Sequence, residues 1–184
     1  MSTAVEPEVS TSTWQMDPIH STAQFKVKHM MISNVKGEFT SVSGTLQLDE
    51  TDVTKSKLEA FIDATTINTR DPQRDAHLKS ADFLETEKFP VLTFKSTSVS
   101  KETNGDLAVK GDLTIHGVTR NVVFDVEAPS ARQKDPWGNT RIGFSATTQI
   151  NRKDFGLTWN TVLETGGILV GDDVTITLDV EFVK

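Results

Sequence analysis

The sequence contains no cysteine and no tyrosine. Without cysteine the chain can form no disulfide, no thiolate nucleophile and no zinc–thiolate site. Basic residues are the minority, since 19 lysines and arginines against 26 acidic residues give a formal net charge of −7. No run of Lys or Arg interrupts this balance. We therefore expect neither nucleic acid as a main partner nor docking on an anionic membrane.

Long apolar runs are absent as well, and we expect no segment that spans a bilayer. Residues 1–13 have no positively charged start and no apolar stretch, so they do not form a secretory signal. The sequence therefore predicts a flexible tail at 1–13, one domain at 14–184 and a cytoplasmic location. A homodimer is compatible with this sequence.

The apolar residues that are present alternate with polar ones. The clearest case is the last segment, in which one parity is apolar and the other is mostly polar; the apolar members are Val174, Ile176, Leu178, Val180 and Phe182. Alternation with period two is typical of a strand with one face in an apolar interior and the other in water. Ten phenylalanines without a tyrosine suit an interior that offers no partner for a hydroxyl.

The same alternation recurs along the chain. Strands are predicted at 14–17, 23–31, 37–49, 58–66, 91–99, 107–115, 122–128, 142–150 and 174–182, with a bend near Ser41. Asn104-Gly105 is a strong hairpin signal. About eight antiparallel strands indicate an all-β barrel or a two-sheet sandwich. We favour the barrel, because the terminal strand carries no proline or inward charge to protect an open edge.

One segment has a different pattern. Asp71-Pro72 is typical of a helix cap followed by a first-turn proline, and Phe89-Pro90 closes the segment. Leu78, Phe83 and Leu84 fit this helix, which we expect to cover one end of the sheet.

If the barrel encloses a space, strand parity predicts the side chains that line it. Those residues are Phe25, Val27, His29, Leu46, Phe94, Leu113, Phe124, Phe144, Ile176 and Leu178. His29 has two interpretations: a hydrogen-bonded core histidine, which we favour, or a polar contact for a ligand head group.

Cationic residues crowd the start of the helix. Arg70, Arg74 and His77, together with Lys79, could attract an anionic head group near the barrel mouth. The simpler interpretation, which we favour, is a solvated face balanced by neighbouring aspartates.

Neither a metal site nor a catalytic triad is expected. No two histidines have metal-ligand spacing. Asp17, His20 and Ser21 include the residue types of a hydrolase triad but are almost contiguous and lack a nucleophile elbow. Glu164 and Asp172 flank glycine-rich turns and are expected to form those turns.

Three aromatic residues lie at turns or strand ends, Trp137, Phe155 and Trp159. We expect them to plug the bottom of the barrel.

Several strings, in order along residues 14–184, resemble those of the YceI-like family of polyisoprenoid-binding proteins. They are Asp17-Pro18-Ile19-His20-Ser21, Val27-Lys28-His29-Met30, Arg74-Asp75-Ala76-His77-Leu78, Phe89-Pro90, the segment Gly111–Thr119, the segment Asn151–Leu157, Leu163-Glu164-Thr165-Gly166-Gly167 and Val170-Gly171-Asp172. The resemblance implies an antiparallel eight-stranded lipocalin-like barrel with one short helix. It also implies a long pore that takes an isoprenoid tail, such as a polyprenyl phosphate or a quinone-like lipid. Many relatives look periplasmic, and this sequence departs from them in lacking a signal.

The resulting functional hypothesis is non-catalytic binding of an amphiphilic isoprenoid lipid for carriage, storage or sensing, with no other cofactor. Two alternatives remain. The protein could be an enzyme acting on a small apolar substrate, or a lipid-free barrel filled by its own rings.

Overall fold

The structure is a computed structural model that describes residues 10–184. Within this range twelve strands form one antiparallel sheet, with one α-helix and three short 3₁₀ turns. The strands are β1 (Thr11–Met16), β2 (Thr22–His29), β3 (Ser33–Phe39), β4 (Val42–Asp49), β5 (Lys57–Asp63), β6 (Ile67–Asn68), β7 (Val91–Lys101), β8 (Leu107–Ile115), β9 (Val118–Val126), β10 (Gln133–Lys134), β11 (Thr140–Asn151) and β12 (Val170–Val183). The helical elements are η1 (Val53–Lys55), η2 (Ala64–Thr66), α1 (Pro72–Lys79) and η3 (Arg152–Phe155).

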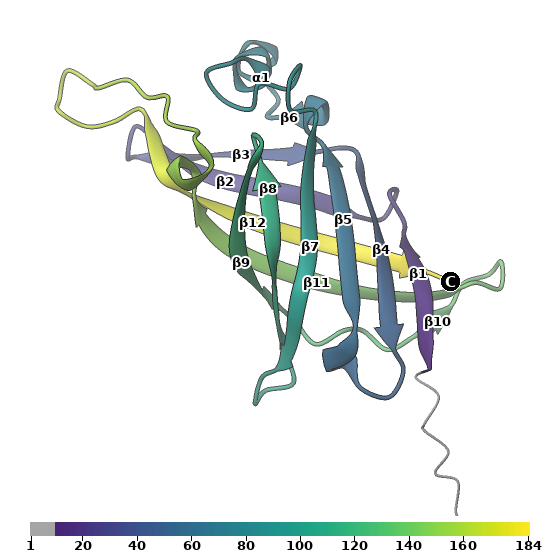
Figure 1. Ribbon diagram of the computed structural model, residues 1–184. Coiled ribbons are helices and arrows are strands. Elements are labelled where there is room, and N and C mark those ends of the chain that lie inside the picture. The colour runs from purple at the N-terminus through teal and green to yellow at the C-terminus, as the bar shows by residue number, and fades with distance from the viewer. Residues whose placement is uncertain (1–9) are drawn as a thin grey trace, which may run out of the picture.

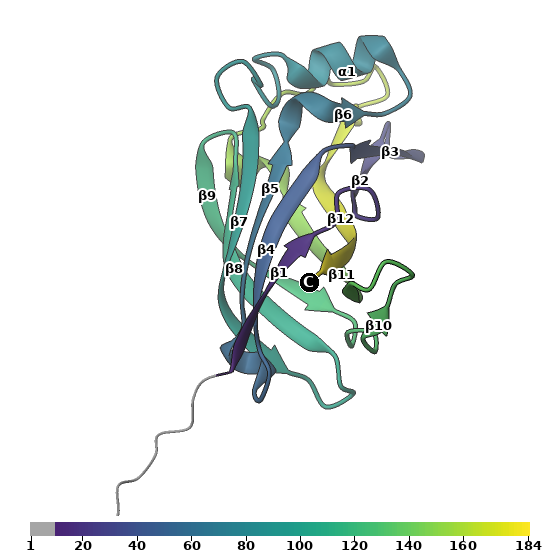
Figure 2. The same ribbon diagram turned by 90° about the vertical axis from the view of Figure 1, so that its right-hand side faces the viewer.

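The sheet closes on itself, which confirms the predicted eight-stranded barrel (Figures 1 and 2). β12 pairs with β11 from Asp173 to Val183, and its other edge pairs first with β2 and then with β1. β1 and β2 lie one after the other along the same edge of β12, so together they fill one position around the barrel. On their other side β1 pairs with β4 and β2 pairs with β3, so β3 and β4 together fill the next position. β5 and β6 share a third position in the same way, and β9 and β10, which both pair with β11, share a fourth, so twelve strands fill eight positions. Pairing of β11 with β12 thus joins the two edges that an open sheet would expose to water.

The first strand starts earlier than predicted. Thr11–Thr13 belong to β1, which pairs with β4, rather than to a tail. The physical reason is alternation that continues toward the N-terminus, because Ser12, Trp14 and Met16 are all buried. Residues 1–9 of the predicted tail lie outside the described part of the chain.

The bend predicted near Ser41 is present, because Thr40 and Ser41 separate β3 from β4. Just before it, Gly37 provides space that a larger residue would fill. A β-carbon at Gly37 would collide with the Phe25 ring, on the neighbouring strand β2. Glycine at this position therefore lets the Phe25 ring pack closely against the backbone of β3.

Helix α1 begins as predicted and ends earlier. The Asp71 carboxylate accepts hydrogen bonds from the backbone N–H groups of Gln73 and Arg74, and Pro72 occupies the first turn. Ser80 then turns extended while its backbone N–H and its hydroxyl both donate to the carbonyl of His77. The helix stops there, and Phe83 and Leu84 lie in the turns that follow. Figure 2 shows α1 covering one end of the barrel.

The predicted aromatic plug is wrong for two of its three members. Trp137 is 81% exposed in the turn before β11. Trp159 packs beside α1, with its ring centroid 4.7 Å from that of His77 and 5.3 Å from that of Phe83. Phe155 is 1% exposed and belongs to the core.

Candidate functional site

The barrel encloses a cavity of about 260 Å³. This volume far exceeds the roughly 10–15 Å³ that a single water needs. Its wall reaches from Leu78 of α1 and from Phe83 and Leu84, which follow α1, to Leu48 and Val53 at the opposite end of the barrel. The cavity therefore runs through the long dimension of the fold.

Nine of the ten residues that strand parity predicts for the interior line this cavity. They are Phe25, Val27, Leu46, Phe94, Leu113, Phe124, Phe144, Ile176 and Leu178. His29 does not line it. It has the same parity as Phe25 and Val27, but it is the last residue of β2 and lies beyond the wall, next to the β2–β3 turn.

The cavity is hollow because the inward side chains do not fill it. Leu58, Ala60 and Ile176 remain half-buried although they face the interior. The rings pack against one another along the wall instead. Ring centroids of Phe94 and Phe124 are 5.2 Å apart, and other wall rings pair at 5.5 and 5.9 Å.

The wall is apolar almost throughout. Of the residues that the structure describes, two charged ones contribute to it, Lys57 and Arg152, and no Asp, Glu or His does. Such a wall offers a hydrocarbon chain contact along its length and offers a polar substrate no carboxylate or imidazole as a general acid or base.

Arg152, in η3, is the buried exception, and sequence analysis did not single it out. It is 3% exposed, and its Nε donates to the carbonyl of Gly171 at 2.8 Å. One of its terminal nitrogens donates to the carbonyls of Leu157 and Trp159 at 2.6 and 2.9 Å. Burial lowers the pKa of Arg152, against the opposing effect of the Asp172 carboxylate 3.7 Å away. Arg152 thus fixes the segment 157–171 to the end of the barrel near α1.

The predicted head-group residues lie at that same end but form contacts within the chain. Arg74 donates from Nε to the Thr69 hydroxyl and from a terminal nitrogen to the Thr69 carbonyl, both at 2.8 Å. His77 Nε2 is 2.7 Å from the Asp82 carboxylate. Arg70 is exposed, with a left-handed backbone at φ 65°. None of the three lines the cavity.

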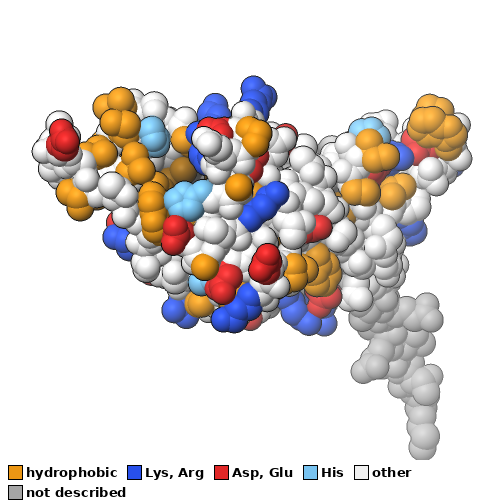
Figure 3. Space-filling model, turned by 90° about the horizontal axis from the view of Figure 1, so that it is seen from above, with side chains coloured by type: hydrophobic (Ala, Val, Ile, Leu, Met, Phe, Trp, Pro, Cys, Tyr) orange, Lys and Arg blue, Asp and Glu red, His pale blue; other side chains and the backbone are white. Residues whose placement is uncertain are grey.

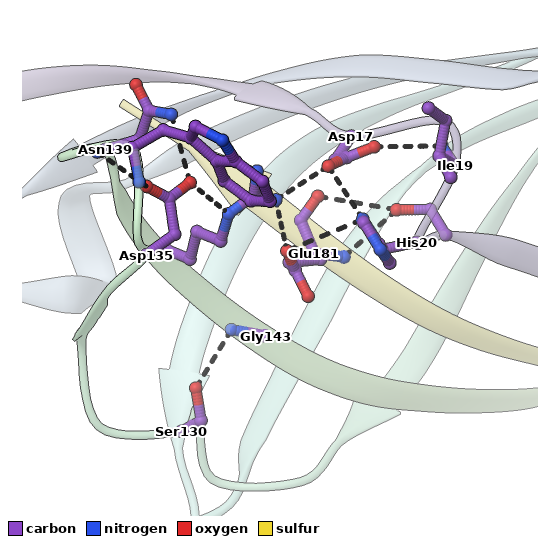
Figure 4. A network of polar contacts seen from close by, with 11 residues as sticks. Asp17, Ile19, His20, Ser130, Asp135, Asn139, Gly143 and Glu181 are labelled. Atoms are coloured by element: carbon purple, nitrogen blue, oxygen red, sulfur yellow. Dashed lines mark hydrogen bonds and ion pairs between the residues drawn. The ribbon is translucent and has the colours of Figure 1, made fainter.

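Figure 4 shows a separate polar cluster around Asp17, His20 and Glu181, and none of these three residues lines the cavity. Asp17, His20 and Glu181 approach closely enough to suggest metal ligands. Arg141 bonds to two of them, because one terminal nitrogen donates to Asp17 at 2.7 Å and to Glu181. A guanidinium ion there already neutralises the carboxylates that a cation would need. Ser21 donates to and accepts from the Glu181 backbone, so it is no partner of His20 and forms no triad.

Through Arg141, the same cluster connects Asp17, Asp135 and Glu181, which lie in three different segments of the chain. It also lowers the pKa values of Asp17 and Asp135. Hydrogen bonds from His20 and Arg141 hold the pKa of Asp17 well below its ordinary value. Hydrogen bonds from Asn139 and Arg141 lower the pKa of Asp135 to about 2. The carboxylates raise the pKa of Arg141 in return.

Replacing Arg141 with glutamine is expected to lower the free energy of unfolding at neutral pH. Carboxyl groups with depressed pKa values stabilise the fold above their unfolded pKa, near 3.9, and this contribution is lost as the pH falls through the folded values. The difference between wild type and Arg141→Gln should therefore shrink from about pH 4 to pH 2. Urea unfolding at several pH values measures it. Lys95→Gln, which removes an exposed pair with Glu59, is the control and should change little. A difference that is constant with pH would contradict the assignment.

A family model for the YceI-like domain matches residues 14–182, nearly the whole described chain. The chain belongs to the YceI-like family. This YceI-like chain is also 38% identical over 171 residues to a UPF0312 protein of Staphylococcus aureus strain MSSA476, a match that covers 93% of this chain and 97% of the relative.

Solved structures share the YceI-like fold. BcnA of Burkholderia cenocepacia superposes with a TM-score of 0.78 at 20% identity, over 90% of this chain and 98% of BcnA. A polyisoprenoid binding domain from Saccharophagus degradans superposes with a TM-score of 0.64 at 17% identity, over 92% and 97%. Along residues 10–184 of this YceI-like chain, no helix has the length and hydropathy needed to cross a membrane.

Proposed function

We propose that this YceI-like protein binds an amphiphilic lipid with an isoprenoid chain in its barrel, without catalysing a reaction on it. The observation that carries the proposal is the hollow apolar cavity beneath α1. Burial of each methylene contributes roughly 0.8 kcal/mol, so a chain of a few isoprene units gains enough to offset the ordering of its bonds. The structural neighbour described as a polyisoprenoid binding domain supports the isoprenoid class.

The chemistry of the wall supports binding over catalysis. A reaction needs a positioned acid, base or nucleophile within reach of the substrate. Within residues 10–184 the cavity wall has no carboxylate and no imidazole, and its buried cation, Arg152, already donates to backbone carbonyls. The perturbed carboxyl groups of Asp17 and Asp135 lie in the polar cluster outside the cavity.

The head group of the lipid is placed at the α1 end in this proposal. Arg70 is an exposed cation there, with Arg74 and His77 beside it on α1. Of the three, Arg70 is the candidate for direct contact, because Arg74 and His77 already bond to Thr69 and Asp82. An anionic head group such as a phosphate suits this position.

Calorimetric titration of delipidated protein tests the proposal. A polyprenyl phosphate should bind at one saturable site with a negative heat-capacity change, the signature of apolar burial. Inorganic phosphate, which lacks the chain, should give no such signal. A straight-chain alkyl phosphate of equal carbon number reports whether branching matters. Absence of saturable binding by either lipid, or equal binding by phosphate alone, would refute the proposal.

A further inference from the structure

Exposed apolar side chains gather on one projection of the barrel. Met30, Met31 and Ile32, in the β2–β3 turn, are 40%, 58% and 80% exposed, and Val162 in the segment 161–169 is 76% exposed. We call these four residues the apolar tip. The Met30 N–H donates to the Leu169 carbonyl at 2.8 Å, so the turn and the segment form one unit. Figure 3, viewed from the α1 end, shows apolar side chains gathered at the left, where Figure 1 places this projection.

The local fold does not explain the methionines in this turn. The Ile32 N–H closes the turn onto the His29 carbonyl at 3.1 Å, and φ is 50° at Met30 and 62° at Met31. Positive φ at both central residues is the requirement of turns in which Asn-Gly is preferred. Two methionines there introduce backbone strain, and both remain exposed on the surface. Local strain of this kind is a feature of binding sites.

A basic face adjoins the tip. Lys26 and Lys28 on β2 and Lys36 on β3 are all exposed, and Lys26 lies directly opposite Lys36. Like charges opposite each other destabilise a sheet. None of the three lysines forms a salt bridge within residues 10–184, and Glu38 is the one carboxylate of the hairpin. In a chain of net charge −7, this hairpin is a local cationic site.

We propose that the β2–β3 hairpin docks on an anionic phospholipid membrane, with the apolar tip inserted at the interface and the three lysines on the lipid head groups. Proteins that bind anionic membrane surfaces typically combine apolar side chains that insert at the interface with neighbouring basic residues that contact the head groups. This revises the expectation from sequence, which found no run of basic residues. The lysines alternate along two strands, and only pairing of β2 with β3 places them on one face.

Docking at this place brings the cavity to the bilayer. Val27 and Val170 line the cavity, and they lie three residues before Met30 and one residue after Leu169. A lipid chain could then pass between the membrane and the barrel near the tip. That role in loading rests on the proposed function, whereas docking itself does not.

Vesicle flotation tests the docking proposal with vesicles of phosphatidylcholine, with or without phosphatidylglycerol. Wild type should float with the anionic vesicles and bind neutral ones at least about tenfold more weakly. The double variant Met30→Asn/Met31→Gly should lose at least about tenfold in binding to anionic vesicles. Its midpoint of thermal unfolding should equal or exceed that of wild type, because Asn-Gly suits the turn. Trp137→Ser, which removes an exposed apolar ring elsewhere, should bind as wild type does.

The charge contribution has its own matched pair of variants. Lys26→Gln/Lys28→Gln/Lys36→Gln should lose the preference for anionic vesicles, and added salt should weaken wild type in the same way. The control carries the same change in net charge at exposed lysines on other strands, Lys101→Gln/Lys110→Gln/Lys134→Gln, and should keep that preference.

Three outcomes would overturn the proposal. They are no flotation of wild type, equal flotation of the tip variant, or a tip variant that changes only the oligomeric state, which would assign the tip to a second copy. Failure of docking is distinguishable from failure of the proposed function, because the calorimetric titration uses no vesicles. A tip variant that binds polyprenyl phosphate normally but does not float retains the lipid site and lacks the docking surface.

Discussion

Replacing Arg152 with methionine is expected to lower the free energy of unfolding by about 3–5 kcal/mol. Arg152 is buried and donates to the carbonyls of Gly171, Leu157 and Trp159. Methionine matches much of its length and removes every donor, so these carbonyls lose their partner in an environment with little water. The side chain of Asp172 loses its buried counter-charge as well.

Urea denaturation of Arg152→Met measures this change, and Lys153→Met is the matched control. Lys153 is the adjacent residue and binds the same carboxylate, with its Nζ 3.0 Å from Asp172, but it is exposed. Exposed pairs contribute about 0–1 kcal/mol, so the control should stay within that range. Equal losses in the two variants would show that burial of Arg152 has no special effect on stability.

Replacing Ala60 with phenylalanine is expected to weaken binding of a polyprenyl phosphate at least about tenfold. Ala60 is half-buried on the inner face of β5, opposite Gly44 of β4 and Phe94 of β7. A ring at this position would occupy the space of at least two methylenes of the ligand, which corresponds to about 1.6 kcal/mol of lost burial, or roughly fifteenfold. Because the ring enters open apolar space, the free energy of unfolding should change by less than about 1 kcal/mol.

The control for this variant is Ala108→Phe. Ala108 alternates with Leu107 and Val109 of β8, which line the cavity, and does not itself line it. The same calorimetric titration compares the two variants. If Ala60→Phe folds and binds like Ala108→Phe, the ligand chain does not pass the middle of the barrel.

The sequence predicted the inner face of the barrel well because that information is local. Side chains alternate with period two whatever the strand pairs with, so parity alone placed Phe94, Phe124 and Ile176 on the wall. Parity specifies a face and gives no position along the barrel axis. His29 has the inward parity and still lies beyond the rim, where β2 turns into β3.

Long-range contacts account for two features that the sequence did not predict, the buried Arg152 and the lysine face. The burial of Arg152 depends on hydrogen bonds to backbone carbonyls up to nineteen residues away. No local sequence pattern indicates that the turn after β11 buries a guanidinium group. The lysine face likewise needs two strands in register. The early end of helix α1 has a local cause instead, because Ser80 bonds back to the carbonyl of His77. Trp137 is 81% exposed in a turn, where no periodicity indicates whether a side chain faces the core or water.

The central claim is that the hollow barrel holds a hydrocarbon chain, and the most direct measurement is native mass spectrometry of the purified protein, followed by organic extraction and mass analysis of what is released. The account predicts an added mass that leaves in organic solvent and is an amphiphile with an isoprenoid chain, at no more than one molecule per barrel. Protein that carries no lipid after expression, and that stays free of it after incubation with a polyprenyl phosphate, would contradict the account.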